Sequence, residues 1–146
     1  MSGEGRHPGT RLPDDATVFH GIRASSWINR DTGQVQAVAF LRRENEDALS
    51  VSESRENAVR VLRRHYGVAR LTVQAVRSVR TESDACLGLD VVSDPVLEPP
   101  PGDPWHALIL RLPAWAPPGT EDAQLQQGAA DALLAIATPE WLAPPL

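Results

Sequence analysis

Residues 48–79 constrain the fold most, because they read as a strand, a capped helix and a second strand in direct succession. Residues 48–51 form a short extended run, and residues 52–66 carry apolar side chains at helical spacing. Gly67 stands where a left-handed helix C-cap is expected, and residues 68–71 are again extended. A helix placed between two strands in so short a stretch predicts a small domain of the α+β class.

Further strands and one more helix are predicted on both sides of this stretch. Alternating or extended apolar runs predict strands at residues 17–22, 34–41, 87–92 and 105–112. Residues 72–79 fit either a continued strand or a short helix capped by Thr72. A final helix is predicted at residues 121–137, with Thr120 as its N-cap and Pro139 as its end.

Together these elements predict one α+β domain in residues 16–138, with a small, mainly antiparallel sheet, one central packed helix and a C-terminal helix. A chain of 146 residues with 42% hydrophobic content has room for one such core. Residues 1–15 are rich in Gly, Pro and charge, and we expect them to be disordered. Residues 139–146 contain three prolines and are expected to form a proline-broken tail.

Composition excludes several kinds of chemistry. All 14 basic residues are arginine, which excludes Schiff-base catalysis and a P-loop lysine and is typical of a GC-rich bacterial genome. The single cysteine, Cys86, excludes an internal disulfide and a cysteine-based zinc site, and it fits a reducing compartment. No apolar run approaches the ~20 residues of a membrane-spanning helix, and residues 1–15 lack the apolar core of a signal peptide. We therefore expect a cytoplasmic protein without a membrane partner.

Charge is strongly segregated along the chain. Residues 1–54 carry six arginines and eight acids, for a net charge of −2. Residues 55–80 carry seven arginines and one acid, for +6, whereas residues 81–146 carry one arginine and ten acids, for −9. The central segment could therefore meet an acidic partner, or it could balance the chain's own acidic C-terminal part.

Arginines and tryptophans supply the candidate partner-binding residues. Arg60, Arg63 and Arg64 share the outer side of the predicted helix, where they would bind an acidic surface or form an ordinary solvated face. The pI of about 5.3 and the lack of aromatic residues among these arginines argue against a nucleic-acid partner. Trp115 and Trp141 lie in proline-rich segments and could anchor a partner or dock on their own domain. We expect a protein partner.

Histidines and serines supply the candidate catalytic residues. His20 precedes Gly21 in an extended apolar run, where a histidine can act as a base or be half-buried in a structural role. Ser50 and Ser52 are possible nucleophiles, but neither belongs to a G-x-S-x-G elbow. His106 could frame a pocket with His20. The histidines are widely spaced and lack a nearby acidic signature, so no metal site is expected.

The order of these residues resembles the N-terminal core of the ADP-ribosyltransferase-like folds, which include the NAD-degrading RES toxins. The resemblance covers about residues 17–71 and consists of His20-Gly21 on the first strand, LSVS on the second, then a helix and a strand. It implies an enzyme acting on NAD, with His20 and Ser50 as catalytic residues. The second strand contains no aromatic residue to stack on nicotinamide, and no glutamate stands on an obvious third strand.

The function preferred from the sequence is a non-catalytic bacterial accessory or protein-interaction subunit. It would act through the arginine-rich helix face and the exposed Trp/Pro segments, without a cofactor. The alternative is the NAD-consuming transferase or glycohydrolase that the resemblance implies, with NAD as its substrate.

Overall fold

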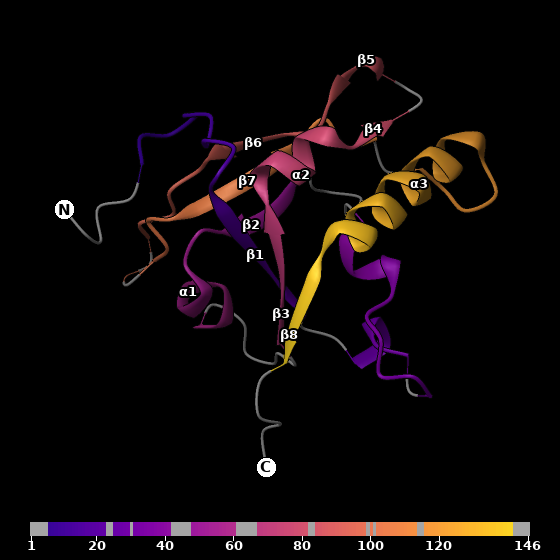
Figure 1. Ribbon diagram of the computed structural model, residues 1–146, viewed down its shortest axis with the longest axis horizontal. Helices are drawn as coiled ribbons and strands as arrows, with labels where there is room; N and C mark the ends of the chain where they lie inside the picture. The colour runs from indigo at the N-terminus through magenta and orange to yellow at the C-terminus, as the bar shows by residue number, and fades with distance from the viewer. Residues whose placement is uncertain are drawn as a thin grey trace.

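A computed structural model describes most of the chain (Figure 1). The described residues are 6–22, 25–29, 31–41, 48–60, 67–81, 84–98, 100, 102–113 and 116–141. In chain order their elements, with η marking a 3₁₀ helix, are β1 (Thr17–Ile22), η1 (Ser25–Trp27), η2 (Ala37–Phe40), β2 (Leu49–Ser52), α1 (Arg55–Arg60), β3 (Gly67–Thr72), α2 (Val73–Ser78), β4 (Arg80–Thr81), β5 (Asp84–Gly88), β6 (Asp90–Ser93), β7 (His106–Leu110), α3 (Glu121–Ile136) and β8 (Thr138–Trp141).

Six of these strands form one antiparallel sheet in the order β6-β7-β2-β1-β3-β8, and β4 pairs with β5 in a separate hairpin. β1 pairs along its whole length with β3, but it pairs with β2 at Phe19, which lies opposite Ser52. The sheet, the helix packed on it and the C-terminal helix α3 confirm the predicted α+β class and its mainly antiparallel sheet.

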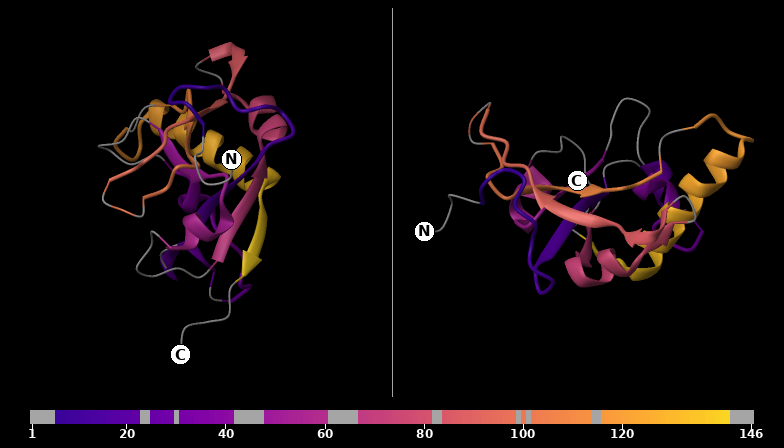
Figure 2. Two further views of the ribbon diagram at one scale, coloured as in Figure 1. Left: turned by 90° about the vertical axis from the view of Figure 1, so that its left-hand side faces the viewer. Right: turned by 90° about the horizontal axis from the view of Figure 1, so that it is seen from above.

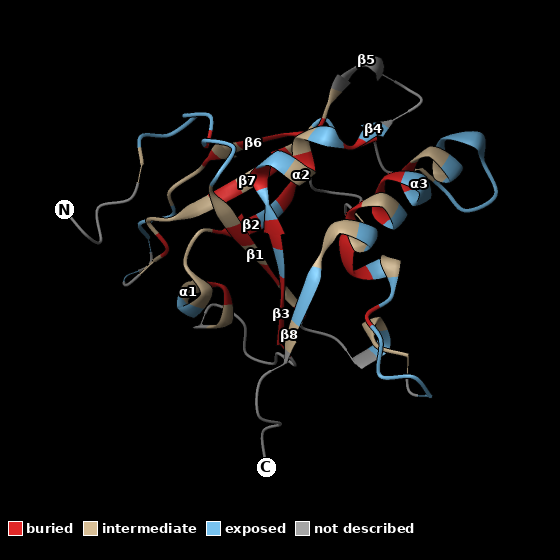
Figure 3. Ribbon diagram, in the orientation of Figure 1, coloured by how far each residue is buried: buried red, intermediate tan, exposed pale blue. Residues whose placement is uncertain are grey.

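Alternation along the strands divides the sheet into two faces. In β1, Val18 and Ile22 are buried in the core cluster, whereas Phe19 between them is half-buried on the other side. Side chains from α2, η2 and α3 complete the core on the first side, which we call the core face (Figure 3). The largest fully buried side chains include Phe40, Leu12, Ile22, Leu71, Ile109 and Leu133.

Helix α1 contacts β1, β2 and β3, and in two views it lies on the other side of β1 from α3 (Figures 1 and 2). Its Ala58 and the Val68 side chain of β3 are buried outside the core cluster. We call this second side the open face, because Ser50 of β2 is exposed there and its partner Leu108 of β7 is half-buried. Predicted helix residues 61–66 lie outside the described residues.

Threonine caps start two helices as the sequence indicates. Residues 73–78 form helix α2, and the Thr72 side chain accepts a hydrogen bond from Ala75 N at 3.3 Å, so the helical alternative for this segment is confirmed. The Thr120 side chain likewise accepts from Ala123 N at 3.1 Å, which confirms the predicted cap of α3. Gly67, predicted to be a C-cap, is the first residue of β3.

The strand predicted at residues 34–41 is wrong, because this segment contains η2. Ala39 and Phe40 are consecutive and both buried, whereas a strand would place them on opposite faces. η2 packs beside α3, and Val35 makes an isolated antiparallel bridge with Ile28. The alternation of side chains favoured a strand here. The packing against α3, which is remote in sequence, favours the 3₁₀ helix instead.

The N-terminal segment differs from the expectation of disorder over residues 6–15. Gly9 N and Leu12 N donate hydrogen bonds to the carbonyl oxygens of Ser93 and Val91, at 2.8 and 3.1 Å, so the segment lines the outer edge of β6. The Leu12 side chain is 1% exposed and belongs to the core cluster. Residues 1–5 lie outside the described residues.

The predicted C-terminal tail also differs, because Thr138–Trp141 forms strand β8 at the edge of the sheet. Pro139 lies opposite Ala69 of β3, and Trp141 lies opposite Gly67. An edge strand tolerates proline, since one of its sides needs no ladder hydrogen bonds. The helix therefore ends before Pro139, as predicted, but Pro139 itself belongs to strand β8.

Candidate functional site

A row of polar and aromatic residues crosses the open face of the sheet. Strand register places Arg70 of β3 opposite Phe19 of β1, Phe19 opposite Ser52 of β2, and Ser52 opposite His106 of β7. Beyond β7, Asp94 N donates a hydrogen bond of 2.7 Å to His106 O, so Asp94 continues the row just after β6. The fold thus brings an acid, a histidine and a serine side by side on neighbouring strands.

His106 and Asp94 form the best-defined polar pair of this row. His106 Nδ1 lies 3.2 Å from Asp94 Oδ2 and 2.9 Å from Asp94 O, and both oxygens can only accept a hydrogen bond. The Nδ1 atom therefore carries the proton, which leaves Nε2 of the neutral ring as an acceptor. The His106 side chain is 18% exposed, so the ring is mostly covered by its neighbours.

A hairpin from Val96 to Asp103, which we call the proline hairpin, rises next to this pair. Val96 N donates to Asp103 O at 2.9 Å, and Asp103 N donates to Val96 O at 2.5 Å. The buried Asp103 carboxylate accepts hydrogen bonds from Asn57 Nδ2 at 2.9 Å and from Trp105 N at 3.0 Å. These bonds tie the base of the hairpin to α1 and to the start of β7.

The tip of the proline hairpin presents apolar surface to solvent. Leu97 is 64% exposed, the highest value among the large hydrophobic residues of the described part of the chain, and Val96 beside it is exposed as well. Gly102 has φ +61, and a Cβ atom at this position would lie 2.2 Å from Val96 O. The hairpin therefore requires glycine at this position to close on itself.

His20, a predicted catalytic residue, occupies a buried structural position. Its Nδ1 lies 2.9 Å from Ser50 O, and its Nε2 lies 2.6 Å from Ala39 O. The ring stacks on Trp27 at a centroid distance of 6.2 Å and meets Phe40 at 5.4 Å. His20 thus links β1 to β2 and η2, and Ser50 meets it through its carbonyl oxygen while the Ser50 residue is exposed.

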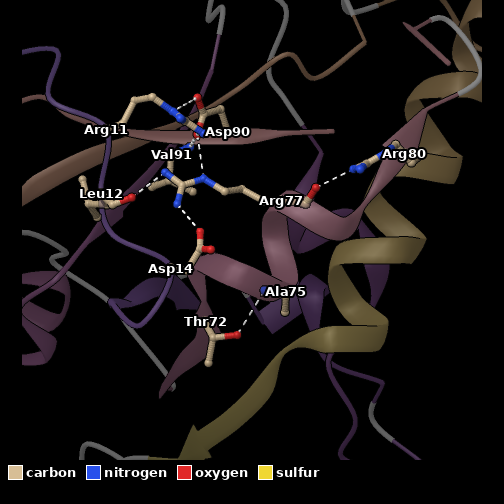
Figure 4. Close-up of polar contacts among 9 residues, drawn as sticks. All are labelled: Arg11, Leu12, Asp14, Thr72, Ala75, Arg77, Arg80, Asp90 and Val91. Atoms are coloured by element: carbon tan, nitrogen blue, oxygen red, sulfur yellow. Dashed lines mark hydrogen bonds and ion pairs between the residues drawn. The ribbon is translucent and has the colours of Figure 1, made fainter. Parts of the chain in front are cut away.

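Arg77 of α2 is the centre of a second polar cluster, at the end of the sheet (Figure 4). Its guanidinium donates to Asp90 Oδ1 at 2.9 Å, to Asp14 Oδ1 at 2.6 Å and to Leu12 O at 2.5 Å. Arg11 Nε also donates to Asp90, at 2.9 Å to Oδ2. This cluster connects α2 to β6 and to the N-terminal segment.

Burial and ion pairing oppose each other in this cluster. Burial acts to raise the pKa of Asp90, but hydrogen bonds from Arg11, Arg77 and the Val91 amide outweigh it and hold that pKa below its usual value. Burial acts to lower the pKa of Arg77, but hydrogen bonds to Asp14 and Asp90 raise it above its usual value. Both groups therefore remain charged at neutral pH, which suits a structural ion pair.

The predicted partner-binding residues lie largely outside the described residues. This holds for Arg63, Arg64 and Trp115, and for the side chains of Arg60 in α1 and Trp141 in β8. Their role stays a prediction.

Two arginines beside the predicted helix face have partners within the chain. Arg55 Nε lies 2.9 Å from Glu140 Oε1, and Arg70 Nε lies 3.3 Å from Glu140 Oε2. These pairs accord with the alternative in which the basic segment balances the acidic C-terminal part.

Sequence reasoning missed two carboxylates of this region. Asp94 stands beside His106, although the sequence pattern indicated no acidic neighbour for the histidines, and Asp103 is buried at the base of the proline hairpin. The available signal was the antiparallel pairing of β6 with β7, which folds the chain back on itself and returns Asp94 to His106.

Comparison of the chain with protein-family models, with curated proteins and with solved structures finds no match. Among the described residues, no cluster of three or more His, Cys, Asp or Glu side chains is arranged to hold a metal ion. Within the same part of the chain, no helix combines the length and the apolar character needed to cross a bilayer.

Proposed function

We propose that this chain is a protein-binding accessory module, and that the proline hairpin is its contact surface. The observation that carries this proposal is Leu97, a large apolar side chain held in solvent on a hairpin with a fixed base. Val96 and Pro100 are exposed beside it and extend the apolar surface. Their partner would offer an apolar pocket.

Rigidity of the hairpin base favours binding by a well-defined contact. Two backbone hydrogen bonds close the hairpin, and the buried Asp103 carboxylate ties it to Asn57 and Trp105. A loop that is ordered before it binds loses little conformational entropy in the complex. The apolar tip can therefore contribute most of its burial to affinity.

Replacement of one side chain tests this proposal. Leu97→Asp should abolish recovery of a specific partner from cells of the source organism and raise the Kd of the purified complex, while the melting temperature stays unchanged. Val38→Asp is the matched control. Val38 is also a large exposed apolar residue, but it belongs to η2 and not to the proline hairpin. Equal recovery with wild type and Leu97→Asp, or equal loss with Val38→Asp, would contradict the proposal.

The arginine face is the second part of the proposed contact surface. Reversal of Arg60, Arg63 and Arg64 to Glu should weaken the complex, and added salt should weaken the wild-type complex, because exposed charges are screened beyond about 8–10 Å. If these arginines only balance the chain's own acids, as Arg55 and Arg70 do with Glu140, the variant loses stability and still binds when folded.

Action on NAD stays a prediction from the resemblance, and the position of His20 favours the binding function over it. Both ring nitrogens of His20 face backbone carbonyl oxygens, and the ring is buried against Trp27 and Phe40. A catalytic base needs a nitrogen that can reach substrate. Incubation with NAD should release no nicotinamide; release that disappears in Ser50→Ala would reverse this preference.

A further inference from the structure

Two exposed arginines meet at Gly88, the last residue of β5. They are Arg80 in β4 and Arg111, which directly follows β7. Arg111 Nη1 donates a hydrogen bond of 3.0 Å to Gly88 O. Arg80 lies opposite Gly88 in the β4–β5 ladder, and its Nη1 packs where a side chain on Gly88 would begin. Both contacts are to one residue, so the two guanidinium groups lie close together at the protein surface.

Glycine at position 88 makes this arrangement possible. A Cβ atom there would collide with Arg80 Nη1 and with the backbone oxygen of Arg77. The same Nη1 donates a hydrogen bond of 2.5 Å to Arg77 O, which holds the Arg80 side chain against the end of α2 (Figure 4). Within the described residues, Arg80 and Arg111 each give one of five N–H donors to a carbonyl oxygen, so both keep donors for a ligand.

The charges of these two arginines are not neutralised by a described side chain. Other arginines pair with carboxylates at distances between 2.6 and 3.3 Å, namely Arg6, Arg11, Arg55, Arg70 and Arg77. In the same described part of the chain, Arg80 and Arg111 donate to backbone oxygens alone. The buried carboxylate of the neighbouring cluster, Asp90, is already shared by two arginines. Two like charges held side by side repel each other, and an anion placed between them offsets that repulsion.

The backbone of Arg111 is a second, independent observation at this place. Among the described residues, Arg111 is the one residue other than glycine with a positive φ, +69. A left-handed backbone is unfavourable for a residue that carries a Cβ atom, and such residues cluster at functional sites. Glycine would adopt this turn without the penalty, so the fold alone does not require arginine here. The arginine side chain instead places a second guanidinium group beside Arg80.

We propose that Arg80 and Arg111 form a binding site for a phosphate dianion, either inorganic phosphate or the monoester of a small molecule. The planar fork of each guanidinium group matches the oxygens of phosphate. The two positive charges also match the charge of a phosphate monoester, about −1.5 to −2 at pH 7, whereas a carboxylate carries one negative charge. The net charge of −5 disfavours a nucleic acid as the source of the phosphate. This site goes beyond the proposed protein binding and shares no residue with the proline hairpin.

Titration of the intact chain with sodium phosphate, followed by NMR, tests the proposal without any variant. The amide signal of Gly88 and the side-chain Nε–H signals of Arg80 and Arg111 should shift and saturate. Sodium acetate at the same ionic strength is the control, since it screens charges equally but offers a monoanion, and it should give no saturating shift. Inorganic phosphate and glycerol phosphate carry the same group, and the ratio of their Kd values distinguishes the two sources.

Removal of one guanidinium group tests the role of its charge. Arg80→Gln should raise the Kd for phosphate by about tenfold, the loss expected when a hydrogen bond to a charged group is removed. Arg70→Gln is the matched control, because it removes the same charge from another exposed arginine, one that is paired with Glu140, and it should leave the Kd unchanged. Equal Kd values in wild type and Arg80→Gln, or equal losses in the two variants, would overturn the proposal.

Arg111→Gly separates binding from stability. Glycine accepts the left-handed φ, so the variant should lose phosphate binding while its melting temperature does not fall. A lower melting temperature would show that the Arg111 side chain also supports the fold, and Arg80→Gln then decides the question of binding. Retained binding in Arg111→Gly, the absence of a saturating shift with phosphate, or the same response to acetate would each overturn the proposal.

Discussion

Arg77 and Asp90 are joined by a hydrogen bond of 2.9 Å from Nε to Oδ1, at a point where three parts of the chain meet. Arg77 also holds Asp14, and Arg11 holds the other oxygen of Asp90, so the pair fastens α2 and the N-terminal segment to β6 (Figure 4). The Asp90 side chain is almost fully buried. Loss of its negative charge would leave Arg11 and Arg77 without the carboxylate that they share.

Acid should destabilise the fold through this carboxylate. Its pKa is lower in the folded state, so its stabilisation is complete above the ordinary aspartate pKa of about 3.9 and is lost as the pH falls through the folded value. Asp90→Asn should lower the free energy of unfolding at pH 7 by about 1.5–3 kcal/mol, the worth of hydrogen bonds to a charged group, and should flatten its acid dependence. Urea unfolding across a pH series measures both effects. Asp131→Asn, at an exposed position, should change neither.

Leu12→Ala should destabilise the protein by about 2–5 kcal/mol, because it removes a fully buried side chain and leaves a cavity in the core. The matched control is Leu97→Ala, which truncates an exposed leucine and should stay within about 0.5 kcal/mol of wild type. Chemical unfolding of both variants gives the comparison. Equal stabilities would mean that the N-terminal segment does not contribute to the core.

His20→Phe should destabilise the fold even though it keeps an aromatic ring between Trp27 and Phe40. A neutral imidazole has one N–H and donates to only one of the carbonyl oxygens of Ser50 and Ala39, so the variant leaves one covered acceptor without its donor, at a cost of about 1–3 kcal/mol. His7→Phe is the exposed control. A thermal melt of His20→Phe that coincides with wild type would show that ring packing alone fixes this position.

Gly102→Ala should distort the proline hairpin, because its Cβ atom would lie 2.2 Å from Val96 O. Gly33→Ala is a sharp control, since Gly33 also has a positive φ, +71, but nothing lies within 4 Å of its added Cβ. Both variants carry the cost of about 1–2 kcal/mol for a left-handed alanine, and only Gly102→Ala adds the clash. Amide exchange at Asp103 should accelerate in Gly102→Ala and remain unchanged in Gly33→Ala.

Local patterns predicted the elements whose signals are local. The cap at Thr120 depends on neighbouring residues and appears where the sequence placed it, and the strand predicted at residues 48–51 appears as β2, shifted by one residue. Leu12 was missed because one apolar residue in a polar segment shows no period, and its partners in β6 are remote in sequence. His106 was recognised without Asp94, since only the pairing of β6 with β7 reveals that they are neighbours.

The two edges of the sheet bear on how this protein behaves when crowded with copies of itself. An uncovered edge strand is a template on which another chain can extend the ladder. At β6 the chain's own residues 9–12 already fill that place. At β8 the strand is four residues long and contains Pro139, which has no amide hydrogen to offer a second molecule. Within the described residues, both ends of the sheet are therefore poor templates for a second molecule, which disfavours edge-to-edge association between copies of the chain.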